Sequence, residues 1–115
     1  MASNTVLMKR HDTRPFLDIA LTNVDGNAVD LTITGITVEF IMKNYETNEL
    51  VISSGACTII DSVNGKVRYA WASADTDTAG TFLGEFEVNY ADGTKLTIPT
   101  SKPLSIVILE DYDNA

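Results

Sequence analysis

The chain has 115 residues, of which 44% are apolar and 21% are charged. This length and composition predict one folded domain with a single core, and they argue against wholesale disorder. The formal net charge of −8 argues against a general nucleic-acid binder and against binding to anionic membranes, because both functions need a basic face.

The single cysteine, Cys57, excludes an internal disulfide. It lies in the apolar-leaning run Ala56 to Ile60, so we expect it to be a buried small side chain rather than a reactive thiol. The first ten residues lack the apolar core of a secretion signal, and no apolar run approaches the roughly 18 to 20 residues of a membrane span. We therefore expect a protein made in the cytoplasm.

In chain order, short runs with alternating apolar and polar residues are separated by turn signals such as Asp25-Gly26, Asn64-Gly65 and Asp92-Gly93. Period-two runs with such turns predict an all-β fold of about seven to nine strands. The expected extended segments are residues 14–22, 28–31, 37–43, 50–52, 56–60, 66–72, 82–90, 94–98 and 103–109. The last of these is apolar on both faces, so we expect it to be central or covered.

The turn before residues 82–90 indicates the type of sandwich. An aromatic residue, Phe82, follows Gly80 by two positions after an Asp/Thr-rich turn, which is typical of the tyrosine corner in immunoglobulin-like folds. Phe82 lacks the hydroxyl group of that corner, and Gly84 stands where antibody domains have cysteine, while Trp71 is a candidate core tryptophan. We predict a single immunoglobulin-like antiparallel β-sandwich.

Several motifs occur in a fixed order: Lys9 to Pro15, Asp25-Gly26, Val29 to Leu31, Val38 to Met42, Gly65 to Trp71, Asp75 to Phe82, Glu85 to Val88, Tyr90 to Gly93 and Ile98-Pro99. Together they resemble the N-terminal domain of phage upper baseplate proteins and similar small tailed-phage virion proteins, over roughly residues 9 to 109. The resemblance implies a β-sandwich that docks onto other virion proteins and has no catalytic residues. We therefore expect a non-enzymatic docking or adaptor domain in the baseplate, tail or connector.

The residues offer little for catalysis or metal binding. His11 is the sole histidine, and the sequence has no Gly-x-Ser-x-Gly elbow. A zinc site needs more cysteine and histidine than one of each. Asp75 and Asp77 copy the start of a calcium loop, but Ala79 occupies the next ligand position and Phe86 replaces the bidentate glutamate. We expect no catalytic residues, no cofactor and no metal.

The charged ends are the predicted contact regions. We expect residues 1–13 to form an N-terminal arm, residues 14–110 the sandwich, and residues 111–115 a flexible acidic tail. The predicted protein-contact residues are Lys9, Arg10, His11, Arg14, Glu110, Asp111 and Tyr112. Opposite charges at the two ends would suit head-to-tail or ring contacts in a homo-oligomer or a multicopy arrangement.

Two alternative functions stay open on the same fold. One is a capsid-surface decoration or head-fibre protein. The other is a monomeric module that binds carbohydrate or a host surface, for which Tyr45 is the candidate aromatic contact. Under each hypothesis that places the protein in the virion, we expect its partners to be other structural proteins of the particle, and we expect no nucleic acid and no membrane.

Overall fold

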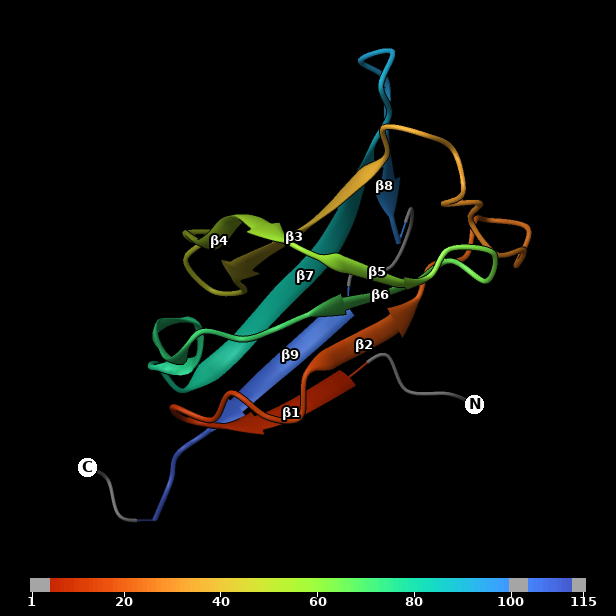
Figure 1. The fold of residues 1–115 in the computed structure, drawn as a ribbon. Coiled ribbons are helices and arrows are strands. Elements are labelled where there is room, and N and C mark those ends of the chain that lie inside the picture. The colour runs from red at the N-terminus through yellow and green to blue at the C-terminus, as the bar shows by residue number, and fades with distance from the viewer. Residues whose placement is uncertain (1–4, 100–103, 113–115) are drawn as a thin grey trace.

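The computed structural model describes residues 5–99 and 104–112. Within this part the chain forms nine strands and one short 3-10 helix (Figure 1). The elements are β1 (Thr5–Lys9), β2 (Leu17–Ala20), β3 (Thr37–Asn44), β4 (Leu50–Ala56), β5 (Thr58–Asp61), β6 (Lys66–Tyr69), η1 (Ser73–Thr76), β7 (Gly80–Asn89), β8 (Lys95–Ile98) and β9 (Leu104–Leu109).

The strands form two sheets that pack face to face, which confirms the predicted all-β sandwich. The large sheet has six strands in the order β1-β9-β7-β3-β4, with β8 also paired to β7, and the small sheet has the order β2-β6-β5. Strands β8 and β9 share one edge of β7: β8 pairs with Phe86–Asn89 and β9 with Gly80–Gly84. The chain changes sheet at Cys57, between β4 and β5.

The large sheet is mixed, whereas we predicted an antiparallel sandwich. Strand β1 runs parallel to β9, with Thr5 opposite Ser105 and Lys9 opposite Leu109. Parallel neighbours need a long connection, and here nearly the whole domain separates the two strands. The immunoglobulin-like topology stays a prediction.

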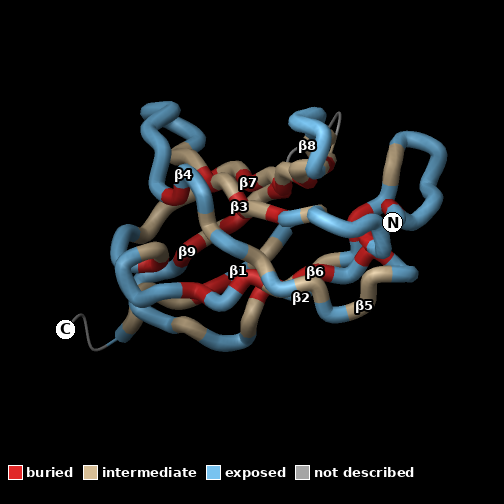
Figure 2. Tube along the Cα trace, turned by 45° about the horizontal axis from the view of Figure 1, so that its top comes forward, coloured by how far each residue is buried: buried red, intermediate tan, exposed pale blue. Residues whose placement is uncertain are grey.

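The core lies between the sheets, as the buried residues in Figure 2 show. Period-two alternation places Phe40 and Phe86 on the inner face of the large sheet and Tyr69 on the facing side of the small one. The ring of Phe40 is the meeting point: its centroid is 5.1 Å from Tyr69, 5.7 Å from Trp71 and 4.9 Å from Phe86. Tilted and edge-on pairs at such distances are favourable beyond the area they bury.

Gly84 makes room for this ring. It pairs with Met42 in the neighbouring strand, and a Cβ at this position would lie 2.7 Å from Cε1 of Phe40 and 2.8 Å from Cδ1 of Ile106. The glycine that stands in place of an immunoglobulin cysteine thus allows close packing between an aromatic and an aliphatic side chain.

Some expected segments differ in extent. The segment 28–31 forms only an isolated bridge between Ala28 and Thr22, and β2 begins at Leu17, after Pro15, which has no N–H group for a sheet. The expected C-terminal strand is β9, and it is indeed central, between β1 and β7. Its first expected residue, Pro103, lies outside the described residues.

Replacing Gly84 with alanine should destabilise the domain by about 1 to 3 kcal/mol, because the added methyl group overpacks a filled core. Urea unfolding followed by tryptophan fluorescence measures the change. The matched control is Glu85→Ala on the outer face of the same strand, which should change stability by no more than about 0.5 kcal/mol. Equal stability of the two variants would contradict the packing role of Gly84.

Candidate protein-contact site at the chain ends

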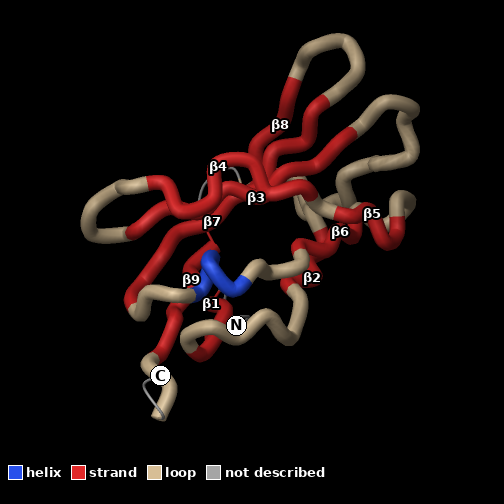
Figure 3. The backbone as a smooth tube through the Cα atoms, turned by 60° about the vertical axis from the view of Figure 1, so that its left-hand side comes forward, coloured by secondary structure: helices blue, strands red, loops and turns tan. Residues whose placement is uncertain are grey.

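The two terminal segments leave the large sheet side by side. Lys9, the last residue of β1, lies opposite Leu109, the last residue of β9. The backbone N–H of Arg10 donates to the carbonyl of Leu109 at 2.8 Å. Residues 10–12 and 110–112 therefore start from one end of the sandwich, where η1 also lies (Figure 3).

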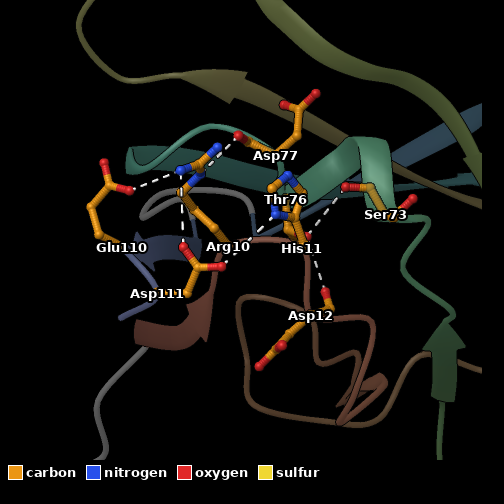
Figure 4. Close-up of polar contacts among 8 residues, drawn as sticks. All are labelled: Arg10, His11, Asp12, Ser73, Thr76, Asp77, Glu110 and Asp111. Atoms are coloured by element: carbon orange, nitrogen blue, oxygen red, sulfur yellow. Dashed lines mark hydrogen bonds and ion pairs between the residues drawn. The ribbon is translucent and has the colours of Figure 1, made fainter. Parts of the chain in front are cut away.

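Arg10 connects both segments to the loop after η1 (Figure 4). Its Nη1 donates to Oε1 of Glu110 at 3.0 Å and lies 3.9 Å from Oδ1 of Asp111. Its Nε donates to the backbone carbonyl of Asp77 at 3.0 Å. The Arg10 side chain is only 22% exposed, so these contacts are screened less than those of an ordinary surface pair.

His11 and Thr76 form the second connection. The backbone N–H of His11 donates to the carbonyl of Thr76 at 2.9 Å, and His11 has a left-handed φ of 68°. The buried hydroxyl group of Thr76 donates to the carbonyl of Asp12 at 3.0 Å. Nδ1 of His11 lies 4.0 Å from Oδ2 of Asp111. These contacts hold the chain after β1 against η1.

The 3-10 helix is itself fixed to the core. Oη of Tyr69 donates to Oδ2 of Asp75 at 2.6 Å, and the same carboxylate oxygen accepts from the backbone N–H of Ala72 at 2.8 Å. Burial, together with the Asp75 hydrogen bond, raises the pKa of Tyr69 above its ordinary value. The acidic turn thus caps a helix and holds a core tyrosine.

Apolar side chains lie beside this charged cluster: Leu7 and Leu109 are on the outer face of β1 and β9, and Tyr112 follows β9. Leu7 is 63% exposed, Leu109 is 43% exposed and Tyr112 is 97% exposed. Nζ of Lys9 lies 4.3 Å from the centroid of the Tyr112 ring, a cation–π contact. We call Leu7, Lys9, Leu109 and Tyr112 the terminal patch.

The structure thus brings together six of the seven predicted contact residues: Lys9, Arg10, His11, Glu110, Asp111 and Tyr112. The opposite charges of the two ends pair within one chain. The predicted arm lies partly in β1, because Thr5–Lys9 belongs to the large sheet, and residues 1–4 and 113–115 lie outside the described residues. The domain boundaries, the contact roles and the head-to-tail contacts stay predictions.

Arg14 is the exception. Its guanidinium carbon lies 4.9 Å from the centroid of the Phe16 ring, and that of Arg68 lies 5.1 Å from the same ring. Arg68 also donates two hydrogen bonds to Asp18, at 2.7 and 2.9 Å, which lower the pKa of that carboxyl group. Arg14 therefore contributes to a cluster with small-sheet residues rather than to the terminal cluster.

Sequence reasoning missed Leu7 and Leu109 as part of this surface. Leu7 falls within the apolar run Val6 to Met8, which we assigned to an arm. Leu109 gave a signal, because the expected C-terminal strand was apolar on both faces. Only the pairing of β1 with β9 shows that the two leucines share one outer face.

Three further findings concern metal binding, membrane helices and the reactivity of the cysteine. Among residues 5–99 and 104–112, no three His, Cys, Asp or Glu side chains are placed to hold a metal ion together. The same residues contain no helix that is long and apolar enough to cross a membrane. Cys57 is half-buried, and burial, with the charge of Glu39, raises the pKa of its thiol to about 12.

These observations define a small β-sandwich domain with an ordered charged cluster and exposed apolar side chains at the same end. The family model of the BppU N-terminal domain matches residues 11–111, nearly the whole chain. The chain belongs to this family, whose model describes the N-terminal domain of the phage baseplate upper protein. It is a structural domain associated with the phage baseplate, which indicates a place in the virion among other virion proteins. The suspected resemblance is confirmed, and no curated protein matched the chain.

Arg10→Gln should destabilise the domain by about 1 to 2 kcal/mol, because one shielded cation holds three segments together. The comparison is Lys95→Gln, which breaks the more exposed 3.6 Å pair with Glu87 and should cost at most about 0.5 kcal/mol. Urea unfolding at low salt measures both values. Equal losses in the two variants would contradict the connecting role of Arg10.

Cys57 should react with iodoacetamide at pH 8 at least about tenfold more slowly in the native protein than in urea, because the raised pKa of the thiol suppresses the thiolate. The pKa of this thiol is about 9.0 in the unfolded chain and about 12 in the folded one. Between these pH values the unfolded thiol loses its proton and the folded thiol keeps it, so the contribution of Cys57 to stability should fall as the pH rises through this range. Equal labelling rates would contradict the burial of the thiol.

Proposed function

We propose that this domain is a non-enzymatic docking or adaptor element that joins other structural proteins of a tailed-phage virion, with the terminal patch as its contact surface. The observation that carries the proposal is the exposure of Leu7, Leu109 and Tyr112 next to the Arg10 cluster. Family membership supports the baseplate as its place in the particle. If the domain instead lies in the tail, in the connector or on the capsid surface, we propose that it uses the same contact surface.

The patch has the composition of a contact surface. Burying a large apolar side chain against a partner contributes roughly 1.5 to 3 kcal/mol, and tyrosine is enriched among the residues that dominate binding. Lys9 lies over the Tyr112 ring, and the contacts of Arg10 with Glu110 and Asp111 hold the residues that precede this ring. A partner would therefore meet an aromatic side chain that is already positioned.

The internal pairing of the terminal charges affects the proposed assembly. Arg10 already faces Glu110 and Asp111 within one chain, so salt bridges between copies would compete with these contacts. We therefore propose that assembly in multiple copies depends on the apolar part of the patch more than on opposite charges.

The alternative of a carbohydrate-binding module depends on Tyr45, which is 60% exposed in the turn between β3 and β4. Within the described residues, the only other large exposed aromatic side chain is Tyr112, which contacts Lys9. A single ring offers a smaller stacking surface than the terminal patch offers to a protein. The docking function is therefore favoured.

The double variant Leu7→Glu, Tyr112→Ala should enter phage particles at least about tenfold less than the unchanged protein, because it places a charge in the patch and removes its aromatic ring. The measurement is quantitative mass spectrometry of purified particles, after complementation of a phage that lacks its own copy. Val24→Glu, an exposed valine in the Asn23–Asn27 turn, is the matched control. Thermal unfolding verifies that both variants fold, and normal incorporation of the double variant would overturn the proposal.

A further inference from the structure

Strand β2 is an edge of the small sheet and, in the part of the chain that is described, pairs only with β6. Beyond the strand, the N–H of Leu21 donates to the carbonyl of Gly65 at 2.8 Å and continues this ladder. Backbone groups alternate in direction along an antiparallel pair, so Ile19 and Leu21 face β6. The N–H and C=O groups of Asp18 and Ala20 therefore point away from the sheet, and both residues are exposed.

The register of this edge is regular. Leu17 to Ala20 pair with Tyr69 to Lys66 without interruption. The edge strands on the other side of the two sheets, β4 and β5, both carry shifts in register. Such irregularities make a strand a poor template for further pairing, and β2, like the edge strand β1, does not have this protection.

Two hollows flank the same edge. A cavity of about 180 Å³ lies between the sheets and is lined mainly by apolar side chains, including Leu21, Phe86, Ile98 and Leu104. A second hollow, of about 290 Å³, lies on the outer side against Asp18, Ile60 and Lys66. Ile19 and Ala20 border both hollows. A strand added to β2 would direct its side chains alternately into the inner cavity and the outer hollow.

The charges beside this edge indicate the composition of such a strand. The outer side carries three cations, Arg14, Lys66 and Arg68, against two carboxylates, Asp18 and Asp61. This local excess of positive charge contrasts with the net charge of −8 of the whole chain. Asp18 is held by Arg68. Lys66 lies opposite Asp61, where the hydrogen bonds from Asn64, helped by the charge of Lys66, lower the pKa of that carboxyl group. Acidic side chains over the outer hollow would complement this face.

We propose that the edge of β2 that carries the outward-pointing groups of Asp18 and Ala20 binds an extended acidic segment of another protein by strand addition. Aliphatic side chains of that segment enter the cavity lined by Leu21, Phe86 and Ile98, and its intervening acidic side chains lie over Lys66. This surface goes beyond the docking function assigned to the terminal patch and does not depend on it.

The test uses a labelled nine-residue synthetic peptide in which valine and glutamate alternate. Fluorescence anisotropy should detect binding below about 1 mM, and NMR-detected hydrogen exchange of Asp18 and Ala20 should slow at least about tenfold at saturation. The same peptide with N-methylated amides should not bind, because it cannot form the ladder. A version with lysine in place of glutamate should bind at least about fivefold more weakly.

The variant Ala20→Pro removes an N–H group that points away from β6, so it should block the peptide while the hydrogen bonds to β6 keep their donors and acceptors. Ala20→Thr keeps the N–H group and is its matched control, and the N-methylated peptide tests the same bonds should the proline variant fail to fold. The double variant Leu7→Glu, Tyr112→Ala should bind the peptide normally, which separates this proposal from the terminal patch.

Several results would overturn the proposal: no binding up to about 1 mM, binding by the N-methylated peptide, or protection away from residues 18 and 20. Self-association without peptide that protects Asp18 and Ala20 would also overturn it, because the edge would then serve a second copy of this chain.

Discussion

Strand β7 organises the sandwich because three other strands pair along its length. Strand β3 runs beside one edge from Thr37 to Asn44, while β8 and β9 divide the other edge between them. The middle of β7 is Gly84, and the space above it is filled by Phe40 and Ile106. The ring of Phe40 in turn contacts Tyr69 and Trp71 from the small sheet. One glycine thus sets how closely the large sheet packs its own side chains and how the second sheet meets them.

Both proposed surfaces follow from the unequal size of the two sheets. Among the described residues, a three-stranded sheet packs against a six-stranded one, so β2 ends the small sheet opposite the region where β8 and β9 meet the same edge of β7. This is where the cavity between Leu21 and Leu104 lies. At the outer side of the large sheet, β1 adds to β9 and places Leu7 and Lys9 on the face away from the core. Each surface therefore occurs where the pairing of one sheet stops.

The sequence predicted those strands whose alternation and flanking turns can be recognised locally. Residues 37–43, 66–72 and 82–90 alternate clearly between buried and less buried side chains, and their turns have strong signals, so the predictions agree with β3, β6 and β7. Strand β1 could not be predicted in the same way. Val6, Leu7 and Met8 are consecutive apolar residues, and their partner lies at the other end of the chain.

The candidate site shows the same difference between local signals, which the sequence contains, and long-range pairing, which it does not reveal. The charged and aromatic residues of the terminal cluster were recognised from their composition, yet their pairing was not, because the contact of Arg10 with Glu110 depends on the register of β1 and β9. Thr76 and Asp77 were interpreted as turn residues, after Asp77 had been weighed as a calcium ligand. Their backbone carbonyl groups accept from His11 and Arg10, and backbone acceptors leave no signal in side-chain composition.

The parallel pairing of β1 with β9 also has a mechanical consequence. Thr5 begins β1 opposite Ser105, and Lys9 ends it opposite Leu109, so tension applied between Thr5 and Tyr112 would slide the two strands along each other. The hydrogen bonds of the pair would then bear the load together instead of opening one after another, as they would if the strands were peeled apart. A domain built in this way should resist stretching between its ends, a useful property in a baseplate, whose proteins must stay connected.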